Sequence, residues 1–157
     1  MPHLIDGYNL LRLIQKVNEE LITLTEAGLC RIISEYLVRV RDYGHIFFDG
    51  VGPPDKTNLS NFTYLEVYFS GPNTDADSLI ELKIADNTAP KSLVVVSTDR
   101  RIKAAAKKRK AISLRSEVFW AAMVTQLERQ RPTPEPREKR DGITDGETDQ
   151  WLDIFGM

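Results

Sequence analysis

The sequence predicts an α/β fold: a mostly parallel central sheet with helices on both of its faces. Two observations lead to this prediction. Segments typical of strands and of helices alternate along most of the 157 residues. The run Leu93–Val96 is apolar throughout, as in strands that a parallel sheet buries on both faces. We expect one folded domain over residues 1–130, followed by a different kind of segment over residues 131–157.

Each of the first elements is predicted by residues within its own stretch of the sequence. The apolar pair Leu4-Ile5 forms a short strand, and the apolar residues of 10–14 indicate a short helix facing the core. Thr23-x-x-Glu26 has the form of a capping box at the start of a second helix. Apolar residues then recur at spacings of three and four over residues 29–40, which predicts an amphipathic helix that ends before Gly44.

The later elements continue the alternation. β-branched and aromatic residues predict strands at His45–Phe48 and Thr63–Phe69. A helix is expected to begin near Thr74. The remaining expected elements are the apolar strand already described, a basic helix at 100–110, a short strand at 111–114, and a helix through Leu127 that Ser116 caps.

Composition excludes several classes of protein. No apolar run approaches the roughly 20 residues that span a bilayer, and the first apolar run is too short for a secretion leader. Cys30 is the single cysteine, so no internal disulfide forms, and a cytoplasmic location is expected. With only His3 and His45 beside it, a dedicated zinc site is not expected either.

The net charge of −2 hides a local excess of positive charge. Residues 100–115 contain eight basic side chains and no acidic one. Basic side chains bind phosphate groups without reading sequence, although a solvated helix face has the same composition. The candidate nucleic-acid-binding residues are Arg100, Arg101, Lys103, Lys107, Lys108, Arg109 and Lys110.

Carboxylates follow the predicted strands. Three aspartates come directly after strands and two open a helix: Asp6, Asp49, Asp99, Asp75 and Asp77. The carboxyl ends of parallel strands meet at one edge of a sheet, where such side chains repel one another unless a cation binds them. A single aspartate after a strand is more often a turn former or a helix cap. The repetition favours a site for a hard metal ion, with Asn9 as a neutral oxygen ligand or a water-positioning residue.

Four motifs of the chain together resemble a known family. They are the segments Ile5–Leu11 (IDGYNLL), Phe48–Gly50 (FDG), Thr74–Glu81 (TDADSLIE) and Val95–Arg100 (VVSTDR). Their order and content are similar to those of the NYN branch of the PIN-like nucleases, and most of all to the YacP-like bacterial endoribonucleases. The resemblance covers about residues 2–127.

The resemblance implies a three-layer α/β/α sandwich, dependence on Mg²⁺ or Mn²⁺, and cleavage of RNA. It implies that the catalytic residues are Asp6, Asn9, Asp77 and Asp99, with Asn9 orienting the site. The implied metal ligands are Asp6, Asp49, Asp77 and Asp99. Three further residues are expected to contact the metal ligands without binding the ion themselves: Asp75, Glu81 and Ser97. For Glu81 a solvated helix face, and for Asp75 a favourable charge at a helix start, remain the alternatives.

The hypotheses for function are therefore ordered. The first is a metal-dependent endoribonuclease; the alternative is a catalytically inactive RNA-binding or adaptor module that uses the basic helix 100–110. A phosphatase or nucleotide-binding domain comes last, because no phosphate-binding glycine loop is present. The residues do not distinguish RNA from DNA as the substrate.

The end of the chain has a different composition. Residues 131–157 begin with three prolines in alternate positions and continue with charged residues, which is typical of a disordered linker. They end in the apolar segment Trp151–Phe155. We interpret this as a docking segment, either for a partner such as the ribosome or another protein, or for the chain's own domain.

Overall fold

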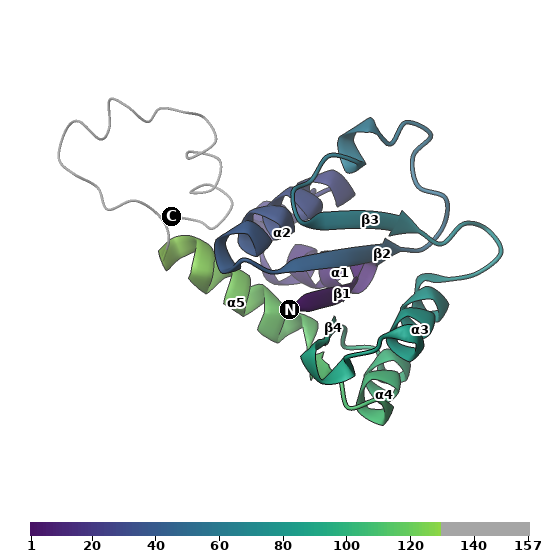
Figure 1. The fold of residues 1–157 in the computed structure, drawn as a ribbon. Coiled ribbons are helices and arrows are strands. Elements are labelled where there is room, and N and C mark those ends of the chain that lie inside the picture. The colour runs from purple at the N-terminus through teal and green to yellow at the C-terminus, as the bar shows by residue number, and fades with distance from the viewer. Residues whose placement is uncertain (130–157) are drawn as a thin grey trace.

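The computed structural model describes residues 1–129, which form one sheet with helices on both sides (Figure 1). The predicted linker at residues 131–157 and the predicted docking segment at Trp151–Phe155 lie outside the described residues. Within the described part, no helix has the length and apolar character needed to cross a membrane.

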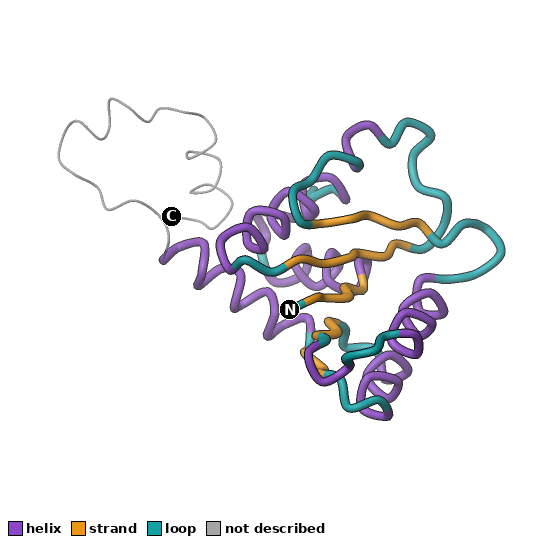
Figure 2. Tube along the Cα trace, in the orientation of Figure 1, coloured by secondary structure: helices purple, strands orange, loops and turns teal. Residues whose placement is uncertain are grey.

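The sheet has five strands, drawn in orange in Figure 2, and every neighbouring pair is parallel. The strands are β1 (Pro2–Asp6), β2 (Tyr43–Phe48), β3 (Leu65–Phe69), β4 (Val94–Val96) and β5 (Ile112–Leu114). Their order in the sheet is β3-β2-β1-β4-β5. The first strand is thus the central one, and all five strands end at the same edge, which we call the strand-end edge. The predicted parallel sheet is confirmed.

Helices cover both faces. On one face lie α1 (Gly7–Val17), α2 (Glu26–Val40) and α5 (Ser116–Arg129); on the other lie α3 (Ala76–Asp86) and α4 (Arg100–Lys108). Short 3₁₀ turns occur at Glu19–Leu21, Thr57–Leu59 and Pro90–Ser92. The predicted three-layer α/β/α sandwich is confirmed, and so is the predicted order of helices and strands.

The smaller of the two cores places the polar residues that follow the strands. Beneath α3 and α4, three adjacent strands contribute Leu4, Phe47 and Val95 to this core. Side chains alternate between faces along a strand. The residues two positions further along therefore continue on the same side, beyond the apolar layer: Asp6, Asp49 and Ser97.

One predicted helix start is wrong. Thr25, not Thr23, caps α2, and its Oγ1 accepts a hydrogen bond of 3.1 Å from the Gly28 amide. The capping box fails because Glu26 is the first helical residue, so its carboxylate is not at the third helical position. That carboxylate accepts a hydrogen bond of 2.7 Å from the Tyr8 hydroxyl instead.

Backbone conformation sets two other boundaries. The strand expected from Thr63 begins only at Leu65, because Tyr64 has a φ of 63°, which no extended strand accommodates. Helix α1 begins at Gly7, earlier than expected. A Cβ atom on Gly7 would lie 2.5 Å from the Phe48 ring and 2.8 Å from the Phe47 carbonyl oxygen. Only glycine allows α1 to start this close to β2.

Candidate active site

The strand-end edge of the sheet gathers the predicted aspartates. Asp6 ends β1, Asp49 follows β2, and Asp99 follows β4 as the N-cap of α4. Helix α3 starts at the same edge, with Asp75 as its N-cap and Asp77 in its first turn. Helix N-termini carry a partial positive charge, which favours carboxylates at these positions.

Asp6 is the most deeply placed of these carboxylates, with 7% of its surface exposed. Its Oδ2 accepts a hydrogen bond of 2.8 Å from the Ser97 hydroxyl. Burial raises the pKa of Asp6 to about 6, and the hydrogen bond from Ser97 opposes this rise. The negative charges of Asp77, Asp99 and Asp49 raise the pKa further. A proton or a cation is therefore bound favourably here near neutral pH.

Asp77 lies within electrostatic range of Asp6 and is partly buried. Burial raises the pKa of Asp77 above its usual value, and the neighbouring charge of Asp99 adds to this effect. The Arg101 guanidinium acts in the opposite direction. Asp99 is held in place by its own helix, since its Oδ1 accepts a hydrogen bond of 2.8 Å from the Arg101 amide.

Two further aspartates accept hydrogen bonds from backbone amides at the start of α3. Asp49 is exposed, and its Oδ1 accepts a hydrogen bond of 2.7 Å from the Ala76 amide. This bond ties the end of β2 to the start of α3. Asp75 caps α3 by accepting a hydrogen bond of 2.7 Å from the Ser78 amide. Helix capping therefore accounts for Asp75, while Asp49 keeps one carboxylate oxygen, Oδ2, for another partner.

Asn9 has a bonding pattern that the sequence did not reveal. Its Oδ1 accepts hydrogen bonds from the Thr98 amide (3.0 Å), the Thr98 hydroxyl (2.9 Å) and the Ser116 hydroxyl (2.6 Å). Asn9 thus joins α1, the loop after β4, and α5. These bonds fix the Asn9 side chain and leave its carbonyl oxygen little capacity to bind a cation, and its orienting role stays a prediction.

Ser116 was predicted as a helix cap, and this is wrong. It is the first residue of α5, is fully buried, and directs its hydroxyl to Asn9. The amides of Val118 and Phe119 instead donate to the Arg115 carbonyl oxygen. The sequence signals for this network were the polar pair Ser97-Thr98, directly after one expected strand, and Ser116, two residues after another.

Glu81 forms an ion pair on a partly exposed face of α3. Its carboxylate accepts two hydrogen bonds of 2.8 Å, from Nε and from Nη2 of Arg101. The same Nη2 donates to the Ser78 hydroxyl at 3.0 Å, and Nη1 lies 3.8 Å from Asp75 Oδ2. The guanidinium is thereby fixed at the rim of the carboxylate cluster, where it joins the first turn of α4 to α3.

The other candidate nucleic-acid-binding residues extend away from this edge. Helix α4 packs through Ile102 and Ala106, which leaves its basic side chains exposed or, for Lys103, partly exposed. Arg100 and Arg101 are in its first turn, next to Asp99. Lys107, Lys108, Arg109 and Lys110 lie at its far end, and the Arg109 guanidinium donates to the Asn87 carbonyl oxygen. Binding of nucleic acid along α4 stays a prediction.

The donor set fits a hard divalent cation in kind. Within residues 1–129, no three His, Cys, Asp or Glu side chains are close enough to hold one ion together. Mg²⁺ usually retains several water molecules and binds through one or two carboxylates together with phosphate oxygens of the substrate. A buried aspartate with a raised pKa, among other carboxylates, matches that requirement better than it matches a complete protein cage.

Comparisons with known proteins agree with the fold and the motifs. The sequence pattern of the YacP-like NYN domain family matches residues 3–152. A crystal structure of a Rae1 (YacP) mutant from Bacillus subtilis is similar, with a TM-score of 0.65 and 22% identity. That match covers 98% of this chain and 91% of the other. Another Rae1 crystal structure from the same organism gives a TM-score of 0.64 and 21% identity, over 82% and 76% of the two chains. Among curated proteins there is no match.

Proposed function

The chain belongs to the YacP-like NYN domain family, and from this premise we propose that it is a divalent-metal-dependent endoribonuclease. Membership of the family indicates a nuclease-type function related to RNA. The finer elements of the proposal are the metal ion, hydrolysis within the RNA chain, and the residues that perform it.

One observation carries the proposal: Asp6 is a buried carboxylate whose pKa is raised to about 6 and whose neighbours are other carboxylates. Such clustering costs free energy in the folded protein, because the like charges of Asp6, Asp77 and Asp99 repel. In a purely structural role this repulsion would only destabilise the fold. A bound cation neutralises the charges and removes the repulsion.

In the proposed site, one or two of Asp6, Asp77 and Asp99 bind the metal ion directly, and the remaining carboxylates, with Asp49 through its Oδ2, act through water molecules on the ion. When bound, Mg²⁺ or Mn²⁺ supplies an activated water molecule and neutralises charge that develops on the phosphate. Ser97 fixes the orientation of Asp6 by its bond to Oδ2, which leaves Oδ1 to bind the ion.

Arg101 is proposed to bind a phosphate of the substrate. The bonds to Glu81 occupy Nε and Nη2 and hold the planar guanidinium in one orientation. The Nη1 protons then remain for phosphate oxygens at the rim of the site. The basic residues further along α4 would extend the contact to neighbouring phosphates of the RNA without selecting a sequence.

The experiment is cleavage of a labelled single-stranded RNA by the full chain, with Mg²⁺, Mn²⁺ or a chelator present. The variants are Asp6→Asn and Asp99→Asn, and the control is Asp86→Asn, an exposed aspartate at the other end of α3. We expect the native chain to cleave within the RNA only when metal ion is present. Both site variants should lose this activity, and the control should retain it. The same strands made of DNA measure the preference between the two nucleic acids.

Binding of RNA without cleavage by the native chain, under every metal condition, would contradict the proposal. Equal binding by both variants would then favour the inactive RNA-binding or adaptor module, with α4 as the contact surface.

A further inference from the structure

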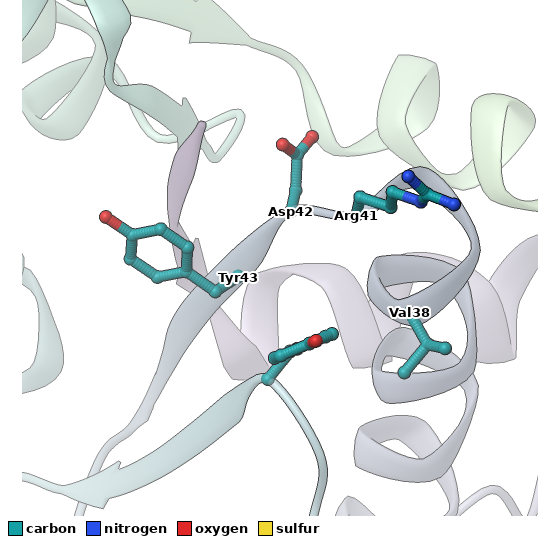
Figure 3. Close-up of a pocket in the computed structure, with 5 residues that line it drawn as sticks. Val38, Arg41, Asp42 and Tyr43 are labelled. Atoms are coloured by element: carbon teal, nitrogen blue, oxygen red, sulfur yellow. The ribbon is translucent and has the colours of Figure 1, made fainter.

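A pocket of about 490 Å³ lies at the edge of the sheet opposite to the carboxylate site, and Figure 3 shows the residues that line it. It is lined by Val38, Arg41, Asp42, Tyr43 and Tyr64. Tyr43 is the first residue of β2, and Tyr64 directly precedes β3. The pocket is thus at the edge where the strands begin, and no residue assigned to the carboxylate site contributes to it.

The pocket combines apolar with charged side chains and is open to solvent. Val38, Tyr43 and Tyr64 are 41%, 52% and 56% exposed, and they are three of the large hydrophobic side chains that the fold leaves in contact with solvent. Single exposed apolar residues are common, whereas a group of them around a hollow indicates a binding surface.

The backbone holds Tyr64 in this pocket at a cost. Its φ of 63° is unfavourable for a bulky aromatic residue. The conformation is fixed on both sides, because the Gly44 amide donates to the Tyr64 carbonyl oxygen (2.9 Å) and the Ser34 hydroxyl donates to the Thr63 carbonyl oxygen (2.7 Å). Strained residues of this kind are concentrated at functional sites, which favours a binding role for the Tyr64 ring in the pocket.

The pocket also carries positive charge. Arg41 is exposed and makes no ion pair with any residue in the range 1–129. The neighbouring carboxylate of Asp42 is paired with the N-terminal ammonium of Met1. An acidic apolar peptide would therefore complement this surface.

Helix α5 brings the end of the described chain to the same edge. It begins at Ser116, whose hydroxyl bonds to Asn9 near the strand-end edge. Its 14 residues span about 21 Å, at 1.5 Å per residue. In Figure 1 its last turn, at Arg129, lies at the end of the molecule where β2 and β3 begin. The last described residue of the chain is therefore on the side of the molecule that holds the pocket.

We propose that this pocket is the docking site for the chain's own segment Trp151–Phe155. The segment has four apolar side chains, and Asp149 and Asp153 beside or within it complement Arg41. Residues 141–153 include five acidic side chains and no basic one. The intervening residues 130–150 reach about 25 Å if they behave as a flexible linker, and such a tether gives a local concentration in the millimolar range. Weak intrinsic affinity is then sufficient for docking.

The test uses tryptophan fluorescence of the full chain. The sequence has two tryptophans, so Trp120→Phe leaves Trp151 as the single reporter. Docking predicts emission that is blue-shifted, and quenching by acrylamide that is severalfold weaker, relative to a free peptide of residues 145–157. Both properties should be independent of protein concentration.

Two pocket variants make the test specific. Tyr64→Gly removes the ring and suits the positive φ, so it should return Trp151 to the behaviour of the free peptide without lowering the melting temperature. Val38→Asp should do the same. The control is Ile22→Ser, an exposed apolar residue outside the pocket, which should leave the quenching unchanged.

Three outcomes would overturn the proposal: quenching equal to that of the free peptide, protection that survives both pocket variants, or protection that increases with concentration, as docking into a second copy requires.

Trp120 is in the core, so the two indole N–H signals of the native chain in a nitrogen–proton spectrum provide a second measurement. The signal that Trp151→Phe removes should shift in Tyr64→Gly. The test does not measure cleavage of RNA. If the chain proves not to be a nuclease, the docking proposal is therefore unaffected.

Discussion

The Ser97 hydroxyl donates a hydrogen bond of 2.8 Å to Asp6 Oδ2 and accepts one of 2.9 Å from the Asp99 amide. Through one oxygen atom, Ser97 connects the end of β1 to the start of α4. The bond stabilises the ionised form of Asp6 and opposes the effect of burial on its pKa. Ser97 therefore positions two proposed metal ligands and limits the rise in the pKa of Asp6.

The substitution Ser97→Ala should move the pH dependence of cleavage. Without the bond, the pKa of Asp6 rises above about 6, since a hydrogen bond to a charged group contributes roughly 1.5–3 kcal/mol, or about one pKa unit or more. Asp6 must be ionised to bind a cation, so the acidic limb of the activity profile should shift to higher pH. The measurement is kcat/KM against pH at subsaturating metal ion. A uniformly lower activity with an unmoved limb would show that Ser97 does not tune Asp6.

Asp6→Asn should make the protein more stable while it abolishes cleavage. The pKa of Asp6 is higher in the folded state, about 6, than its ordinary value of 3.8. Folding therefore takes up a proton between these values, and the ionised side chain destabilises the fold by roughly 3 kcal/mol above pH 6. The asparagine variant avoids this cost, so its advantage in urea denaturation should be largest at pH 7.5 and absent below pH 3.8.

The exposed control Asp86→Asn should change stability little at either pH. Equal stability of the native chain and Asp6→Asn at pH 7.5 would contradict the raised pKa. Adding Mg²⁺ should reduce the difference between the two proteins, because only the native chain gains a ligand for the ion.

Asn9→Ala should destabilise the fold by about 2–3 kcal/mol, because three donors lose their common acceptor and the Ser116 hydroxyl is fully buried. Asn9→Asp keeps an acceptor oxygen in place, so it should retain most of the stability at neutral pH. Denaturation by urea of the three proteins measures both effects. Equal losses in the two variants would show that the bonds to Oδ1 contribute little.

Arg101→Gln should raise the KM for RNA more than it lowers kcat, by roughly ten- to hundredfold if one charged phosphate contact is lost. Glu81→Gln should have a weaker effect in the same direction, because the guanidinium is kept but no longer oriented. Arg101→Lys should not restore the activity, since an ammonium lacks the planar pair of donors. Lys91→Gln, an exposed residue outside α4, is the control. Unchanged KM in Arg101→Gln would exclude the phosphate contact.

The layers, the parallel sheet and the order of its elements were predictable because they follow from local patterns. An apolar run such as Val94–Val96 and a helical spacing such as that of α2 each identify an element without any long-range information. The placement of Asp6, Asp49 and Asp99 at one edge then follows from the parallel direction of the strands.

The bonds within the site were not predictable in the same way. Whether Glu81 faces solvent or Arg101 depends on how α3 packs against α4, and sequence spacing does not specify this packing. The three bonds to Asn9 Oδ1 likewise join residues 89 and 107 positions apart. The capping threonine of α2 was misplaced for a more local reason, because two threonines precede the helix and both satisfy the preference for an N-cap.

The central position of β1 has a consequence for the timing of protein synthesis. Its two neighbours in the sheet are β2 and β4, and Asp6 meets Ser97 across 91 residues of chain. A nascent polypeptide that has exposed only its first half can pair β1 with β2, but it lacks the strand that supplies Ser97 and Asp99. The cluster of carboxylates is thus assembled late, only after the chain has been synthesised beyond Asp99, and an incomplete chain lacks the complete candidate metal site.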